Sequence, residues 1–256
     1  MKTMRFKINL EFVSLLEDST MPIKYHSYFL SLLKRGLEQA APEVYHELYE
    51  TNQQKLFSQA VFFKAAVFEK ERILLKSPNV TYLFSTSQAD LAMAVYNGFI
   101  YLKELKALPF CEGLKIQVKS IAPIYQVPIR ENEVIFQAVS PILARDHNQE
   151  TRKDWFLDFK DERYAAVLKQ NLKNRLEPEL GRSVNFDIDN LTIEPVRMKK
   201  TVTKAYEKYY QGGIGQIKLV GEPYLLNIIR DVGLGSKTGL YFGFLNQVQQ
   251  GGEKNE

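Results

Sequence analysis

Strand-like and helix-like spacings of apolar residues follow one another in the same order in both halves of this chain. This repetition limits the folds that the chain can adopt. Met4 to Phe12 alternates apolar and polar residues, the period of a half-buried strand, whereas residues 23–39 carry apolar side chains at helical spacing. The first half predicts a strand at 4–12, helices at 23–39 and 42–50, strands at 61–67, 73–76 and 81–85, a helix at 91–105 and a strand at 114–121. The second half predicts a strand at 134–139, a helix at 162–176, strands at 184–193 and 216–220, a helix at 224–232 and a strand at 240–248.

The order strand, helix, strand, strand, helix, strand runs through both halves, with one helix and one strand more in the first, so each half predicts a βαββαβ unit. Such a unit forms a four-stranded antiparallel sheet with both helices on one face. The expected fold class is α+β, with two tandem ferredoxin-like domains. Pro123 and Pro128 interrupt the strand pattern between the halves, so we place the junction near residues 123–130. This gives an N-terminal domain at 1–124 and a C-terminal domain at 125–256.

Composition narrows the class of protein. The chain has 256 residues, of which 45% are apolar and 25% charged, as in a globular protein. No stretch approaches the ~20 apolar residues that span a bilayer, so we expect a cytoplasmic protein without membrane contact. Cys111 is the single cysteine, and the three histidines (His26, His46 and His147) show no paired metal-ligand spacing, so we expect no disulfide, metal or other cofactor.

Ten of the 14 glycines fall in the last forty-five residues, and four of them lie in residues 233–244, the glycine-rich loop. Glycine enters positive-φ conformations freely and lets another backbone approach closely, so this density beside a lysine predicts a loop around an anionic ligand. Residues 251–256 have instead the composition of a flexible tail. A P-loop is disfavoured because the GxxxxGK spacing is missing and a strand is expected to follow. The residues of the loop expected to bind are Gly233, Gly235, Ser236, Lys237 and Gly239.

The basic segment, from Arg197 to Lys218, contains six basic residues and one acidic residue, with Tyr206, Tyr209 and Tyr210 between them. Basic side chains neutralise phosphates and aromatic faces stack on unpaired bases, so the segment is a candidate surface for single-stranded or hairpin RNA. A solvated basic face is the equally weighted alternative. The cations of the segment expected to bind RNA are Arg197, Lys199, Lys200, Lys204 and Lys208.

Several motifs together resemble the RAMP superfamily of CRISPR-associated RNA-binding proteins, in particular the endoribonuclease that cuts the CRISPR precursor transcript within its repeats. The glycine-rich loop resembles the family's signature of Gly-hydrophobic-Gly, a polar residue and lysine, and Gly-Phe-Gly. Residues 212–221 resemble its preceding glycine and strand segment, and Ser140-Pro141-Ile142 matches its Ser-Pro-Ile step. Residues 42–58 resemble its second helix and the Lys-x-Phe step that follows, here Lys55-Leu56-Phe57.

The resemblance implies a fold and an activity. The fold is two RAMP domains with a C-terminal glycine-rich loop, and the activity is metal-independent cleavage of CRISPR repeat RNA. In such cleavage the 2′-hydroxyl attacks the neighbouring phosphate and leaves a 2′,3′-cyclic phosphate and a 5′-hydroxyl. The reaction needs a base, an acid and a cation for the phosphorane charge. Partners implied are the precursor transcript and proteins of a CRISPR effector complex, and a homodimer is left open.

The sequence departs from the family at the histidine of a Leu-His-Glu step, which falls here on Leu48-Tyr49-Glu50. His46 lies one helical turn earlier on about the same face. Three interpretations stay open: His46 transfers protons with Lys55 as the cation; tyrosines such as Tyr28 and Tyr49 do so slowly; or the chain binds repeat RNA without cutting it. His26, beside Tyr25 and Tyr28, is a further candidate at this site, and His147 is expected to contact RNA or to have no role.

Overall fold

The computed structural model describes residues 4–16, 18–51, 54–148 and 150–248, so the tail predicted at 251–256 lies outside the described residues. The chain forms two compact units. The first comprises Met1–Gln126 with two later segments, Val202–Tyr210 and Thr238–Tyr241. The second comprises the rest of the second half, at Val127–Thr201, Gln211–Lys237 and Phe242–Glu256. The boundary predicted between residues 124 and 125 stays a prediction.

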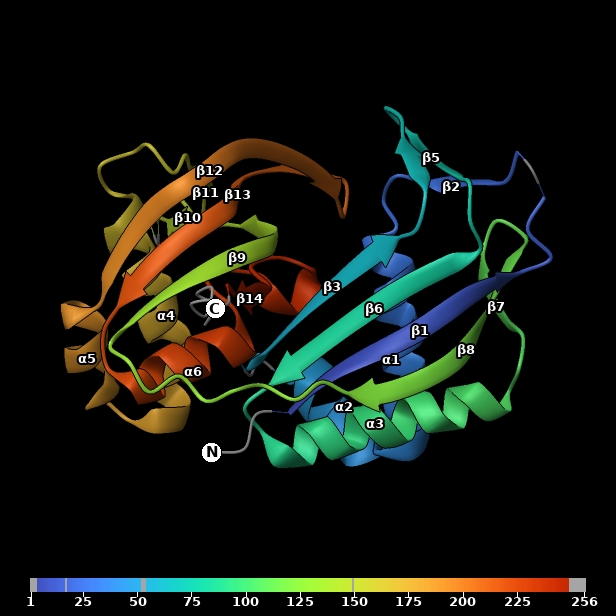
Figure 1. The fold of residues 1–256 in the computed structure, drawn as a ribbon, viewed down its shortest axis with the longest axis horizontal. Coiled ribbons are helices and arrows are strands. Elements are labelled where there is room, and N and C mark those ends of the chain that lie inside the picture. The colour runs from blue at the N-terminus through green and yellow to red at the C-terminus, as the bar shows by residue number, and fades with distance from the viewer. Residues whose placement is uncertain (1–3, 17, 52–53, 149, 249–256) are drawn as a thin grey trace, which may run out of the picture. The chain divides into compact units, whose positions relative to one another are not determined.

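A five-stranded antiparallel sheet forms the centre of the first unit, with strand order β3-β6-β1-β8-β7 (Figure 1). Alternate residues of β1, including Ile8, Leu10 and Phe12, are buried against the helices, as the alternating pattern predicts. Helices α1 and α3 pack against each other and on this sheet. The elements are β1 (Met4–Val13), α1 (His26–Ala40), α2 (Pro42–Tyr49), β3 (Phe57–Phe63), β6 (Asn79–Thr86), α3 (Ala89–Glu104), β7 (Leu108–Cys111) and β8 (Leu114–Pro123).

A smaller three-stranded sheet is inserted into this unit, with order β2-β5-β4. Its strands are β2 (Thr20–Pro22), β4 (Ala66–Phe68) and β5 (Arg72–Leu75). The single strand predicted at 61–67 is therefore wrong: β3 ends at Phe63, and Ala65 adopts a positive φ of 53°, which turns the chain into β4. The predicted strand at 73–76 is present as β5, but it pairs with β4 and β2 and not with β3.

The second unit repeats the arrangement, with strand order β12-β13-β9-β14 (Figure 1). In each sheet the strand that comes first in the βαββαβ order lies between the third and the fourth strands of that order. These are β1 between β6 and β8 in the first unit, and β9 between β13 and β14 in the second, which is the ferredoxin-like order. The prediction of two tandem ferredoxin-like domains is confirmed. The elements are β9 (Glu133–Ile142), β10 (Ala144–His147), β11 (Asp154–Leu157), α4 (Tyr164–Leu180), α5 (Val184–Asn190), β12 (Thr192–Ala205), β13 (Lys208–Val220), α6 (Pro223–Val232), the 3-10 helix η1 (Thr238–Leu240) and β14 (Leu245–Gln247).

Two strand predictions in this half are wrong in extent. Residues 184–190 form α5 because Val184 and Ile188 are buried four residues apart, which is helical spacing, and β12 begins only at Thr192. The strand predicted at 240–248 is reduced to β14, because Tyr241 and Gly243 adopt positive φ values of 71° and 66° and keep the residues before Leu245 out of a regular strand. Within the described residues, no helix is long and apolar enough to cross a membrane.

Candidate functional site

Two lysines flank the ring of Tyr49 in the first unit, and these three residues are named here the Tyr49 site. The Nζ of Lys34, on α1, lies 4.4 Å from the centre of the Tyr49 ring, and the Nζ of Lys55 lies 5.1 Å from it. Burial and the charge of Lys34 lower the pKa of Lys55. Two ammonium groups that share one aromatic ring repel each other, and an anion bound between them would relieve that repulsion.

The Tyr49 hydroxyl is buried and, among the described residues, has no hydrogen-bond partner. Burial, with the neighbouring Tyr206 and Tyr45 hydroxyls, raises its pKa far above the ordinary tyrosine value. Tyr206, at the tip of the β12–β13 hairpin, has its own pKa raised by burial and by Tyr210 and Tyr25. These phenols therefore stay protonated at neutral pH, which removes Tyr49 as a general base.

Gly239 is the part of the glycine-rich loop that meets this site. A Cβ added at Gly239 would lie 3.1 Å from Cδ of Lys55 and 3.1 Å from Cζ of Phe57. The Gly239 carbonyl accepts a hydrogen bond from Nε2 of Gln59, and Oγ1 of Thr238 donates to the Phe57 carbonyl at 2.8 Å. The structure thus brings together Lys55 and Gly239, which the sequence analysis assigned to different roles.

His46 lies on the exposed side of α2, and Nδ1 of its ring pairs with Oε2 of Glu50, one helical turn away. Its side chain is 65% exposed. In the part of the chain that the structure describes, Glu50 is the one hydrogen-bonding partner of His46. Residues three apart on a helix have Cβ atoms about 5–6 Å apart, so His46 is a neighbour of Tyr49 on α2. The pairing through Nδ1 leaves Nε2 directed away from Glu50.

The other candidates on α1 are not part of this arrangement. His26 is only 2% exposed, stacks on Tyr25 with ring centres 4.0 Å apart, and burial lowers its pKa to about 4. A neutral histidine in such a place does not reach RNA on the surface, which is at odds with a catalytic role. Tyr28 packs beside Phe110, with ring centres 5.8 Å apart, and lies six residues, or about 9 Å of helix axis, from Lys34.

In the second unit, the glycine-rich loop is held against the end of β9, where the Ser-Pro-Ile motif lies. The backbone N–H of Ser236 donates to the Leu143 carbonyl at 2.9 Å, and that of Gly243 donates to the Pro141 carbonyl at 2.8 Å. The N–H of Phe244 donates to Oγ of Ser140 at 2.9 Å. The glycine-rich loop and the Ser-Pro-Ile motif, which the sequence analysis treated separately, are thus hydrogen-bonded to each other.

The loop glycines differ in what they require. Gly235 has a φ of 85°, and a Cβ there would lie 2.6 Å from the Leu143 carbonyl oxygen, so other residues do not fit. Gly239 has no positive φ, and a Cβ there would instead press on the side chains of Lys55 and Phe57. Lys237 itself has a φ of 58° and is partly exposed, and Gly233 has a φ of 83° at the end of α6.

The six cations of the basic segment fall into two groups. Three are held by carboxylates: Lys200 by Asp158 at 3.3 Å, Lys204 by Glu71 at 2.6 Å, and Lys218 by Glu194 at 2.8 Å. The other three cations of the segment, Arg197, Lys199 and Lys208, are exposed, and none of them has an acidic partner within the described residues. Arg197 and Lys199 are two residues apart on β12, so their side chains share one face of the strand, and the side chain of Lys200 lies on the other face.

His147 belongs to a separate polar cluster on the hairpin of β10 and β11. Oδ1 of Asp154 accepts hydrogen bonds from Nδ1 of His147 and from Nε of Arg145, both at 2.8 Å. Burial acts against ionisation of Asp154, but these hydrogen bonds hold its pKa below the usual value. The described residues contain no group of three or more His, Cys, Asp or Glu side chains placed to hold a metal ion.

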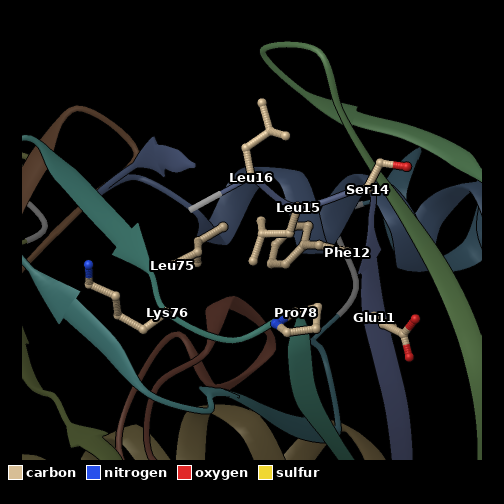
Figure 2. Close-up of a pocket in the computed structure, with 8 residues that line it drawn as sticks. All are labelled: Glu11, Phe12, Ser14, Leu15, Leu16, Leu75, Lys76 and Pro78. Carbon is tan, nitrogen blue, oxygen red and sulfur yellow. The ribbon is translucent and has the colours of Figure 1, made fainter. Parts of the chain in front are cut away.

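A pocket of about 570 Å³ lies elsewhere in the first unit, at the ends of β1 and β5. Figure 2 shows Phe12, Leu15 and Pro78 gathered at its centre, with Lys76 and Glu11 toward opposite edges. None of the residues predicted to bind or cut RNA lines this pocket.

Sequence reasoning missed Lys34 as a member of the site. Lys34 and Tyr49 lie on different helices, and the crossing of α1 and α2 that joins them leaves no spacing signal in the sequence.

Comparison with known proteins shows which proteins this chain resembles in sequence and in fold. Residues 122–247 match the family described as CRISPR associated protein Cas6, C-terminal. A CRISPR-associated endoribonuclease-like protein of Pyrococcus horikoshii, Cas6nc, is 24% identical over 247 residues, covering 95% of this chain and all of the relative. The solved structure of the product of a Cas6-related gene from Pyrococcus furiosus is 20% identical and covers 97% of this chain and all of its own, with a TM-score of 0.82. A RAMP protein that binds different RNA substrates is 22% identical, covers 96% of this chain and all of its own, and has a TM-score of 0.79.

Proposed function

Because the chain is a CRISPR-associated RAMP protein of the Cas6 type, we propose that it binds CRISPR repeat RNA and cuts it without a metal ion. The observation that carries the proposal is the convergence of Lys34 and Lys55 on Tyr49, one helical turn from the exposed His46. This arrangement offers two cations for a phosphate and one imidazole for proton transfer.

Each residue then has a distinct task. Lys34 and Lys55 neutralise the charge that develops on the phosphorane when the 2′-hydroxyl attacks. His46, with Nδ1 fixed by Glu50, transfers a proton through Nε2 to or from the reacting oxygens. Tyr49 takes no proton because its buried hydroxyl stays protonated; its ring supports the two lysines. The products are a 2′,3′-cyclic phosphate and a 5′-hydroxyl.

A second function, repeat-RNA binding without cleavage, is favoured by one observation: the position of the family's histidine holds Tyr49, whose hydroxyl is buried. Such a chain would keep the cations and the loop and lack the chemistry. It would then act as an RNA-binding RAMP subunit of an effector complex. Association with effector-complex proteins, or as a homodimer, stays a prediction.

One experiment separates the two functions. Labelled RNA with one repeat of a CRISPR array from the same genome is incubated with excess protein in EDTA, and single-turnover cleavage and binding are both measured. We expect cleavage at one phosphodiester, a loss of at least about 10²-fold in rate for His46→Ala, and a rate near wild type for Tyr49→Phe. Tight binding without products supports the second function, and equal rates for wild type and His46→Ala contradict the role of His46.

The cations have their own test. The double variant Lys34→Ala with Lys55→Ala should weaken binding of the same RNA, and the matched double variant Lys169→Ala with Lys173→Ala removes the same charge from the surface of α4. Equal affinities for the two double variants would contradict a phosphate at the Tyr49 site.

A further inference from the structure

Arg175 lies inside the second unit on α4, and its side chain reaches the start of the glycine-rich loop. It is only 6% exposed. Its Nη1 donates to the Val232 carbonyl at 3.2 Å and its Nη2 donates to the Gly233 carbonyl at 2.6 Å. Val232 is the last residue of α6, and Gly233 is the first residue of the loop. A buried cation from α4 thus holds the point where α6 ends and the loop begins.

The electrostatics of this point explain why a cation is useful there. The last carbonyls of a helix have no donors within the helix and together carry about half a negative charge. A phosphate bound by the residues that follow would be repelled by that charge. The Arg175 guanidinium supplies donors to two of these carbonyls and a positive charge beside them. The neighbouring Arg230 and Asp231 pair with each other at 3.1 Å and so add little net charge.

An apolar side chain in this position would avoid the free-energy cost of burying a charge. Burial lowers the pKa of Arg175 to about 10, which shows that the surroundings disfavour the charged form, although it stays protonated at neutral pH. A methionine or leucine would fill similar space without burying a charge. The arginine therefore does something that apolar packing does not.

The part of the loop after Gly233 is held by hydrogen bonds to β9 and Leu143. Beyond Gly233, the backbone N–H groups of Ser236, Gly243 and Phe244 are held by β9 and the residue after it. The entrance of the loop is held by Arg175 from α4. Loss of Arg175 would release the entrance while the β9 anchors persist.

We propose that Arg175 is a positioning residue that fixes the entrance of the glycine-rich loop and offsets the negative end of α6, so that the loop can hold an RNA phosphate. The second part rests on the proposed function. The first part concerns the free protein and is measurable without RNA.

The test compares Arg175→Met, Arg175→Lys and the control Leu172→Ala, which removes a buried apolar side chain from the same helix. Hydrogen exchange of the loop amides is measured under conditions of equal global stability, and binding of labelled repeat RNA is titrated in parallel. Arg175→Met should exchange the amides of Gly233 and Leu234, which are hydrogen-bonded at the entrance of the loop, at least about tenfold faster than the control. It should also bind RNA about tenfold more weakly, with partial recovery in Arg175→Lys.

Exchange and affinity equal to those of Leu172→Ala would overturn the proposal, because Arg175 would then act only through stability. A wild type that binds no repeat RNA would contradict the proposed function, and the exchange comparison alone would then decide whether Arg175 holds the loop. Faster exchange with unchanged affinity would overturn the electrostatic part.

Discussion

The two units share one strand order but bury different polar groups beneath their helices. The first unit buries Arg5, phenols and the neutral His26, and its site cations, Lys34 and Lys55, are only half-buried. The second unit buries two arginines, Arg175 and Arg230, and uses one of them to hold a helix end. The same topology therefore places cations in two ways: the first unit leaves Lys34 and Lys55 partly exposed, and the second unit uses the buried Arg175 to fix backbone.

The largest expected effect tests whether His26 is neutral inside the first unit. An unfolded histidine titrates near pH 6.5, whereas burial lowers the pKa of His26 to about 4. Between these values the unfolded chain binds a proton that the folded chain does not, so stability falls as the pH drops from 6.5 toward 4. The gap corresponds to about 3 kcal/mol. Urea unfolding of wild type and His26→Phe at pH 7 and pH 4 measures it.

In that comparison the other titrating groups cancel between the two proteins. We expect the stability difference between wild type and His26→Phe to move by about 3 kcal/mol in favour of the variant at the lower pH. A difference that does not change with pH would mean that His26 is solvated.

The next effect tests whether the loop is fixed by backbone in the second unit. Gly235→Ala must place a Cβ 2.6 Å from the Leu143 carbonyl oxygen at a φ of 85°, so we expect a loss of about 2 kcal/mol in the free energy of unfolding. Gly239→Ala is the matched control, since its new Cβ meets side chains and its φ is ordinary. It should cost less stability but disturb Lys55. Equal losses would remove the distinction between the two glycines.

The third effect concerns RNA binding by the basic segment. Arg197 and Lys199 share a face of β12 and have no acidic partner within the described residues, so Arg197→Ala with Lys199→Ala should weaken repeat-RNA binding. The slope of log affinity against log salt should fall by about 1.4, which is about 0.7 per phosphate on a single strand. Titrations between low and high salt measure both quantities.

Lys200→Ala with Lys218→Ala removes the same charge from two lysines that carboxylates already hold, and should change the slope less. A larger change in the slope for this second pair would place the RNA beside Lys200 and Lys218.

The smallest effect tests the Tyr49 hydroxyl. A buried hydroxyl without a partner destabilises the folded state, so Tyr49→Phe should leave stability unchanged or raise it by about 1 kcal/mol. Urea unfolding at pH 7 is sufficient. A clear loss of stability would mean that the hydroxyl donates a hydrogen bond.

The fold was largely predictable because alternation and helical spacing are local signals. Residues 4–12 and 42–50 were predicted almost to their ends, and the repeated order predicted both sheets. The errors fall where a turn or a helix carries a strand-like composition. Residues 184–190 are an example: Val184 and Ile188 fit either period until the surrounding core selects the helix.

The candidate site was predictable only in part. Lys55 and the glycine-rich loop were named from sequence, but the approach of Gly239 to Lys55 depends on a contact between residues 184 positions apart. Lys34 and Arg175 gave no local signal, because their partners are a ring on another helix and the carbonyls of another helix end. The basic segment looked uniform, and the structure divided it by supplying carboxylates to half of its cations.

By itself the sequence determined the periods of burial and the doubled βαββαβ order, because each depends on neighbours within a few residues. The tertiary structure decided which cations stay available, which hydroxyls and imidazoles are buried, and which side chains meet across helices. Desolvation and charge pairing act through space, so their outcome depends on residues that the chain brings together only when it folds.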